Sequence, residues 1–212
     1  ESIANHLSAE VSKTQISRFA SNEIYAKPLE TVRGCDVFVI QTCTDKVNDD
    51  LMELFIMIDA MKRSGAIKIH VVMPYLGYAR QDRMASSREP ISAKVVANLM
   101  SAAGVDHLIT MTLHSDQTQG FFDFPVDNLG SNKLIGNYFL EKKLDNLVVV
   151  APDTSAARYA KHFADMLGAD LAILHKQRPA HNVAETTHVV GDVAGKTCLI
   201  IDDMIDTAGT VV

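Results

Sequence analysis

The chain has 212 residues, of which 47% are hydrophobic and 22% are charged, a composition that is globular rather than disordered or collagen-like. Its 20 Lys and Arg residues against 26 Asp and Glu residues give a net charge of −6, which argues against general binding to nucleic acid. The length fits one large domain or two small ones.

Apolar runs alternate with amphipathic ones along the chain. In order, they predict a strand over 36–42, a helix over 48–65, a strand over 68–75, a helix over 92–104, a strand over 107–113, a helix over 132–143, a strand over 147–151, a helix over 155–168, and strands over 170–175 and 196–202. Continuous Val, Ile and Leu strands between helices are typical of a parallel sheet that is covered on both faces. We therefore expect an α/β fold.

The ends of the first helices carry capping signals. Asn48 or Asp49 is expected to cap the first helix and Ser92 the second, because short polar side chains bind free backbone N–H groups. Gly65 and Gly104 follow these helices, where glycine adopts the left-handed conformation easily.

A loop rich in Asp, Asn, Pro and Gly lies near 126–131 and separates two strand–helix series. Such a loop favours a domain boundary, so the predicted domains are 1–130 and 131–212. The second series stops at Val212, a few residues past a strand. We therefore expect the second domain to be incomplete.

The three cysteines, Cys35, Cys43 and Cys198, show no CxxC spacing and lie in or beside apolar runs. This pattern favours free thiols in a reducing compartment. No apolar stretch approaches the roughly 18–20 residues of a membrane span, and no charged-then-apolar leader begins the chain. We expect a cytoplasmic protein with no membrane partner.

The first chemically rich loop covers residues 77–90, directly after a strand. It carries Arg80, Arg83 and Arg88 together with Gln81. The planar, permanently charged guanidinium group binds phosphate oxygens in a bidentate manner. A solvated, salt-bridged loop would have the same composition, so these residues alone leave both interpretations open.

Two weaker signals also follow strands. His114 lies beside carboxylates and could bind a metal or carry a proton, although a lone histidine is more often bonded to a neighbouring loop. Asp153 precedes Ser155 at the start of a helix. It could hold a divalent cation there, or it could belong to an ordinary N-cap region.

The segment over 200–210 gives the strongest signal, because an apolar strand runs into Asp202, Asp203 and Asp206. Adjacent carboxylates repel each other unless a metal or sugar hydroxyls lie between them. The small residues that follow, 207–210, would let backbone N–H groups hold a phosphate. An acidic turn with an N-cap explains one acid but not three.

These residues also carry a resemblance. IDDMIDTAGT (201–210) resembles the phosphoribosyl-pyrophosphate motif of type I phosphoribosyltransferases and of ribose-phosphate diphosphokinases. Other segments separate the two: VNDDLMELFIMIDAMKRSGA (47–66), YARQDR (78–83), REPISAKVVANLMSAAG (88–104), LHSDQTQGFFDFPVDNL (113–129) and HKQRP (175–179). Together they resemble class I ribose-phosphate diphosphokinase along essentially the whole chain.

The resemblance implies two phosphoribosyltransferase-like domains with mainly parallel sheets flanked by helices. The family's first strand would precede Glu1, and most of its C-terminal domain would follow Val212. The implied reaction converts ATP and ribose 5-phosphate into AMP and 5-phosphoribosyl 1-diphosphate for nucleotide biosynthesis, with Mg²⁺ as cofactor. The implied assembly is a homo-oligomer, typically a hexamer built from dimers.

Carried over residue by residue, the resemblance implies a role for each part of the site. It implies adenine contacts at Phe19 and Glu23, ATP-phosphate contacts at Arg80, Gln81 and Arg83, magnesium ligands at His114 and Asp153, catalysis by Lys176 and Arg178, and ribose 5-phosphate binding by Asp202, Asp203, Asp206, Thr207, Ala208, Gly209 and Thr210.

Two alternatives stay open. Ser21, Thr112, Ser155 and Ala156 depart from the common residues of the family, which would suit a non-catalytic regulatory homologue that assembles with active subunits. A phosphoribosyltransferase would share the loop over 201–210, but it would have no need for ATP-binding segments.

Overall fold

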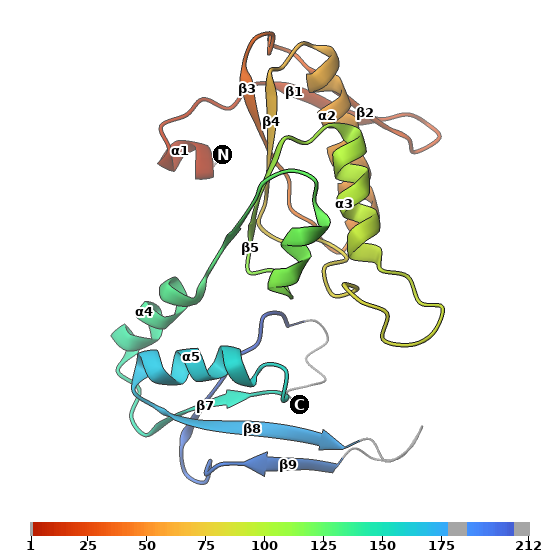
Figure 1. Cartoon of the computed structure of the whole chain (residues 1–212). Helices are drawn as coiled ribbons and strands as arrows, with labels where there is room; N and C mark the ends of the chain where they lie inside the picture. Colours follow the sequence, from red (N-terminus) through yellow and green to blue (C-terminus); the bar gives the residue numbers. More distant parts are fainter. Residues whose placement is uncertain (1, 178–185, 206–212) are drawn as a thin grey trace. The chain divides into compact units, whose positions relative to one another are not determined.

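Figure 1 shows a computed structural model of the whole chain. The structure describes residues 2–177 and 186–205, with side chains through 175 and again from 188. The chain divides into two compact units, Glu1–Leu129 and Gly130–Val212, and each is described below by itself. Both units are α/β, as predicted from the alternation of strands and helices.

The first unit is built on a parallel sheet with the strand order β3-β4-β5-β6. A separate antiparallel hairpin, β1–β2, precedes it. In chain order the elements are α1 (Ser2–His6), β1 (Thr14–Arg18), β2 (Ile24–Pro28), β3 (Asp36–Ile40), α2 (Val47–Arg63), β4 (Lys68–Met73), α3 (Ser92–Ala103), β5 (His107–Met111), the 3₁₀ helix η1 (Asp116–Phe121) and β6 (Val126–Leu129).

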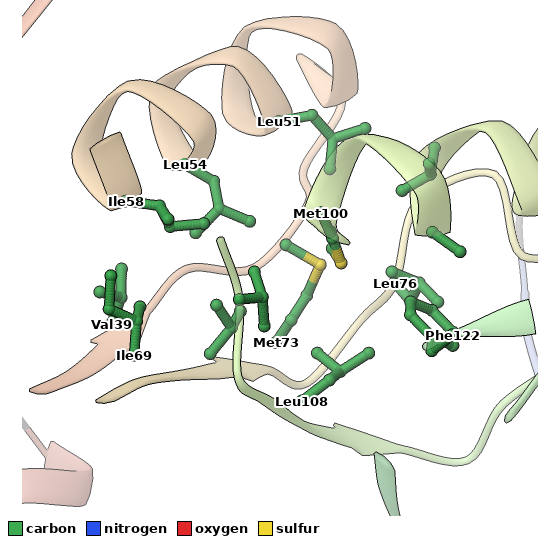
Figure 2. Close-up of a cluster of buried hydrophobic side chains, with 14 of the residues drawn as sticks. Val39, Leu51, Leu54, Ile58, Ile69, Met73, Leu76, Met100, Leu108 and Phe122 are labelled. Atoms are coloured by element: carbon green, nitrogen blue, oxygen red, sulfur yellow. The ribbon is translucent and has the colours of Figure 1, made fainter. Parts of the chain in front are cut away.

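The core of this unit lies between the sheet and helices α2 and α3. In α2, the buried side chains of Leu51, Leu54 and Ile58 recur at helical spacing, so one face of the helix turns toward the strands. Full burial of each such side chain contributes about 1.5–3 kcal/mol. Figure 2 shows these side chains and Met100 of α3 packed with strand residues that include Val39, Ile69, Met73 and Leu108.

Helices α2 and α3 pack on one face of this sheet. Along β3, Val39 is buried toward the helices, whereas Phe38 and Ile40 point to the other face and are 59% and 43% exposed. On that face the Phe38 ring stacks on His70 at 4.5 Å between ring centroids. His70 and His107 lie 3.1 Å apart between their Nδ1 atoms.

Two further expectations need correction. The residues near 126–131, which we expected to form a loop, contain β6, because Val126–Leu129 finds a parallel partner in β5. The N-caps are Lys46 for α2 and Ile91 for α3, and neither makes a side-chain capping bond. The glycine signals are confirmed, since Gly65 and Gly104 adopt φ values of +88° and +105°.

The second unit has the strand order β10-β7-β8-β9, in which β9 alone is antiparallel. Its elements are α4 (Asn132–Lys142), β7 (Leu147–Ala151), α5 (Ala157–Leu167), β8 (Asp170–Gln177), β9 (Thr186–Val190) and β10 (Thr197–Ile200). Helix α5 buries Phe163 against Val149 and Ile201. Because β7 and β10 are parallel neighbours, the residues that follow them meet at one edge of the sheet.

Candidate active site

The first turn of α2 holds the loops that surround it. The Asp50 carboxylate accepts hydrogen bonds from the backbone N–H and the hydroxyl of Thr44, at 2.6 and 2.7 Å. The Asn48 side-chain carbonyl accepts a bond from the Tyr78 hydroxyl. Asn48 therefore ties α2 to the arginine-rich loop after β4 instead of capping its own helix.

That loop begins at a position where only glycine fits. A Cβ atom on Gly77 would lie 2.4 Å from Cγ2 of Val47 and 2.9 Å from Sγ of Cys43, which is far inside van der Waals contact. The missing side chain thus lets the loop cross closely over the start of α2.

The predicted phosphate-binding residues occupy different surroundings within this loop. Gln81 is held at the start of α3, because its carbonyl accepts a bond from the Ala93 N–H at 3.1 Å and its side-chain oxygen accepts one from the Ser92 hydroxyl at 2.5 Å. Arg80 and Arg83 are exposed. The loop therefore presents cationic side chains on a backbone that is anchored at both ends.

Glu89 closes the outer part of the same loop. Its carboxylate accepts bonds from the backbone N–H groups of Ala85 and Ser86, both at 2.9 Å, and from the Ser86 hydroxyl at 2.6 Å. The Ser86 hydroxyl, followed by its N–H group, lowers the pKa of Glu89 below its usual value. This acid serves the shape of the loop.

The predicted adenine-contacting residues lie in the turn between β1 and β2. The Phe19 N–H donates to the Glu23 carbonyl and the Asn22 N–H donates to the Phe19 carbonyl, both at 2.9 Å. The Ser21 hydroxyl donates to the Glu23 carboxylate at 2.5 Å. The structure thus brings Phe19 and Glu23 together in one turn, and Ser21 gives Glu23 a partner.

His114 follows β5 in the first unit and is exposed, whereas Asp153 follows β7 in the second unit. Near His114, the backbone is held by Asn128, which accepts from the Leu113 N–H at 3.0 Å and donates to Asp116 at 3.1 Å. The two predicted magnesium ligands therefore belong to separate units, and their joint role stays a prediction.

In the second unit, the carboxylates at the ends of β7 and β10 influence one another. One oxygen of Asp153 accepts bonds from the N–H groups of Ser155 and Ala156, at 2.7 and 2.9 Å. The Asp203 N–H donates to the Asp202 carboxylate at 2.9 Å. Burial, the Asp203 side chain and the charge of Asp153 raise the pKa of Asp202 to about 6. Asp202 therefore lies in a strongly negative, partly buried site.

This donor set fits a magnesium ion in its chemistry. Throughout residues 2–177 and 186–205, no group of three or more His, Cys, Asp and Glu side chains is arranged to hold a metal. Mg²⁺ usually needs only one or two carboxylates, because water and substrate phosphates complete its coordination. The mutual repulsion of Asp153, Asp202 and Asp203 is what a divalent cation would relieve.

Tyr159 also lies near these carboxylates, although sequence analysis does not single it out. Tyr159 of α5 is half-buried and shares a hydrogen bond with the Ser131 side chain. Burial, and then the charges of Asp203 and Asp202, raise the pKa of its hydroxyl. Tyr159 packs edge-on against Phe163.

Several predicted site residues lie outside what the structure describes. Lys176 belongs to β8 by its backbone, but its side chain and the whole of Arg178 lie outside the described residues. The same holds for Asp206, Thr207, Ala208, Gly209 and Thr210. In the described part of the chain, no helix is both long and apolar enough to cross a bilayer.

Comparisons with known proteins agree with this fold. Residues 1–104 match the N-terminal domain of ribose phosphate pyrophosphokinase, and residues 127–212 match the phosphoribosyl transferase domain. Ribose-phosphate pyrophosphokinase of Listeria ivanovii is 52% identical over 212 residues, which are 100% of this chain and 67% of the relative. The corresponding protein of Bacillus caldolyticus is 52% identical over 209 residues, covering 99% and 66%.

A solved structure gives the same result. The phosphoribosylpyrophosphate synthetase of Mycobacterium smegmatis matches with a TM-score of 0.92 and 46% identity, over 99% of this chain and 68% of that one. The fold is that of a phosphoribosyltransferase-like α/β protein. More narrowly, the chain belongs to the ribose-phosphate pyrophosphokinase family, and it spans about two thirds of the length of these relatives.

Proposed function

We propose that this protein is a ribose-phosphate diphosphokinase, an ATP-dependent diphosphotransferase of nucleotide biosynthesis. It transfers the β,γ-diphosphate of ATP to the 1-hydroxyl of ribose 5-phosphate, giving 5-phosphoribosyl 1-diphosphate and AMP. The observation that carries the proposal is the 52% identity that extends over the whole chain to proteins named for this activity. The acidic edge at β7 and β10 supports it independently.

The chemistry requires positioning more than covalent participation. The sugar oxygen attacks the β-phosphorus, the bond from that phosphorus to the bridging oxygen of AMP breaks, and the hydroxyl gives up its proton as the new P–O bond forms. Such phosphoryl transfers are accelerated by alignment and charge neutralisation. The protein must therefore hold two anionic substrates in contact.

On the ATP side, Phe19 and Glu23 are proposed to contact adenine, and Arg80, Gln81 and Arg83 to bind the phosphates. The exposure of Arg80 and Arg83 on an anchored loop supports this role. The Gln81 side chain already accepts a hydrogen bond from the Ser92 hydroxyl at the start of α3. We therefore expect Gln81 to order the loop and the arginines to supply the charge.

On the sugar side, Asp202 and Asp203 are proposed to orient the ribose hydroxyls, and residues 206–210 to bind the 5-phosphate. Asp153 and His114 would hold Mg²⁺, which when bound neutralises phosphate charge. Asp153 keeps one carboxylate oxygen bonded to the start of α5, so it would offer a ligand whose position is fixed.

Lys176 and Arg178 are proposed to neutralise the charge that develops on the transferred diphosphate. Interactions that form only in the transition state raise kcat, whereas interactions made equally in the ground state change KM. The domains over 1–130 and 131–212 would supply the ATP-side and ribose-side loops, respectively. A cytoplasmic location and a hexamer built from dimers stay predictions.

The regulatory-homologue alternative rests on the departures at Ser21, Thr112, Ser155 and Ala156. Of these, Ser155 and Ala156 lie beside Asp153, to which their backbone N–H groups donate. A test separates all three functions. The protein expressed from its natural gene is incubated with Mg·ATP and ribose 5-phosphate, and separately with 5-phosphoribosyl 1-diphosphate and nucleobases, and products are identified by ³¹P NMR. A diphosphokinase forms the diphosphate sugar in the first reaction, a phosphoribosyltransferase consumes it in the second, and a regulatory homologue does neither.

A further inference from the structure

Arg18 makes the connection between the β1–β2 turn and the body of the first unit. Its guanidinium Nη1 donates to the backbone carbonyl and to the side-chain oxygen of Asn22, at 3.1 and 3.2 Å. Its Nη2 donates to the Asp49 carboxylate in the first turn of α2, at 3.0 Å. One planar group thus holds both the turn and the helix.

Asn22, which accepts both of these bonds from Nη1, determines the shape of the turn. Asn22 has φ = +69°, a left-handed conformation that asparagine tolerates better than most residues. Its N–H donates to the Phe19 carbonyl at 2.9 Å. Fixing Asn22 from both its carbonyl and its side chain therefore fixes the path of the chain between Phe19 and Glu23.

Core packing does not hold Phe19 in place. Its side chain is 58% exposed, and it meets Tyr25 edge-on at 5.8 Å between ring centroids. The direction of the ring therefore depends on the backbone of the turn. A ligand that stacks on a ring ordered beforehand binds more tightly, because binding then need not order it.

We infer that Arg18 is a positioning residue for nucleotide binding: by joining Asn22 to Asp49 it holds the Phe19–Glu23 turn in its ligand-ready shape. This inference rests on the proposed function, which assigns Phe19 and Glu23 to adenine. Because Asn48 in the same helical turn holds the loop of Arg80 through Tyr78, the start of α2 anchors both segments that are assigned to ATP.

The chain offers a matched control at the other end of the same helix. Arg63 and Asp59 of α2 also form an exposed ion pair, at 2.7 Å between Nε and Oδ2. Arg63 lies in the last turn of α2, whereas Asp49 lies in the first. A stability effect common to surface ion pairs will appear in both pairs, whereas an effect on nucleotide binding will appear only for Arg18 and Asp49.

The test measures KM for ATP, KM for ribose 5-phosphate and kcat from AMP formation by the wild-type protein and its variants. Arg18→Ala is expected to raise the KM for ATP about five- to tenfold, the effect of losing charge-assisted hydrogen bonds at a partly exposed site. The KM for ribose 5-phosphate and kcat should stay within about twofold, because uniform binding is lost rather than transition-state stabilisation. Arg63→Ala should change none of the three.

Two more variants keep the inference testable if Arg18→Ala does not fold. Arg18→Lys keeps the charge but cannot reach Asn22 and Asp49 with one planar fork, so its KM for ATP should lie between those of the wild type and Arg18→Ala. Asp49→Asn should raise the same KM, and combining it with Arg18→Ala should add little. An unchanged KM for ATP in Arg18→Ala, or an equal rise in Arg63→Ala, overturns the inference.

If the wild-type protein forms no AMP, the proposed function fails separately, and the inference is decided by calorimetric titration of ATP. A loss of ATP affinity in Arg18→Ala but not in Arg63→Ala then supports it. Equal affinity in both variants, or no ATP binding by the wild-type protein, overturns it.

Discussion

The backbone N–H of Asp203 donates to the carboxylate of its neighbour Asp202 across 2.9 Å, where β10 ends. This bond favours the charged form of Asp202, yet burial together with the side chains of Asp203 and Asp153 outweighs it and raises the pKa to about 6. The edge of the second sheet therefore stores electrostatic repulsion that a bound cation or sugar hydroxyls would relieve.

This repulsion predicts that Asp202→Asn stabilises the protein at neutral pH. The folded-state pKa of about 6 lies above the ordinary value of 3.8, so the folded form binds more protons than the unfolded form between these values. The contribution of Asp202 to the free energy of unfolding is therefore fully present below about pH 4, and it is lost as the pH rises toward 6. The melting temperature of Asp202→Asn should exceed that of the wild type at pH 7.5 and approach it at pH 4.

Asp170→Asn provides a control of opposite sign for that experiment. The hydrogen bond from Lys196 lowers the pKa of Asp170. Asp170 therefore stabilises the folded state above the ordinary carboxyl pKa, and this stabilisation is lost in acid. This substitution should lower the melting temperature at pH 7.5. An Asp202→Asn protein that also melts lower at pH 7.5 contradicts the account of the acidic edge.

Replacing both acids at the end of β10 should separate the two substrates. Asp202→Asn with Asp203→Asn is expected to weaken ribose 5-phosphate binding more than ATP binding, because these residues are assigned to the sugar. Calorimetric titration of each ligand measures the ratio, with Asp165→Asn, an exposed acid of α5, as the control. Equal losses for both ligands would refute the assignment.

Lys176→Ala should lower kcat by orders of magnitude while ATP still binds, because a residue that acts on the transition state contributes to rate rather than to ground-state affinity. Steady-state AMP formation and ATP titration measure the two effects. Lys161→Ala, which removes an exposed lysine of α5, should leave both unchanged. Normal turnover in Lys176→Ala would remove this residue from the mechanism.

Gly77→Ala tests the close approach of the arginine-rich loop to α2. The new methyl group would collide with Val47 and Cys43, and overpacking of this kind costs about 1–3 kcal/mol. Urea unfolding should show this loss, and the KM for ATP should rise as the loop shifts. Gly120→Ala, where a Cβ atom meets nothing within 4 Å, should be nearly neutral. Equal stability of the two variants would show that the loop moves away from α2 at no cost, which would contradict a tightly packed crossing at Gly77.

The sequence predicts the central strands and helices well because apolar periodicity reports burial. Leu54 and Ile58 recur on one face of α2 and are fully buried, as their spacing indicates. The pattern is silent for β1, in which four of five residues are exposed. Segment β6 forms because β5 offers it a partner, and pairing with a strand distant in sequence leaves no local signal.

Within the site, too, some residues carry a local sequence signal and others are positioned only by distant partners. Asp202 and Asp203 are recognisable because adjacent acids after an apolar strand need an explanation in terms of a ligand. Arg18 and Asp49 cannot be recognised in this way, because they pair across 31 positions of the sequence. Each alone has the pattern of a solvated surface charge. Local position predicts Asn48 or Asp49 as the cap of α2, but both side chains bind tertiary partners instead.

The most direct test of the central claim is AMP formation from Mg·ATP by the protein expressed from its natural gene, measured with and without ribose 5-phosphate and with phosphate present and absent. The account predicts AMP only when ribose 5-phosphate is present, in amounts equal to the 5-phosphoribosyl 1-diphosphate formed. A folded, oligomeric protein that forms no AMP under any of these conditions would contradict it.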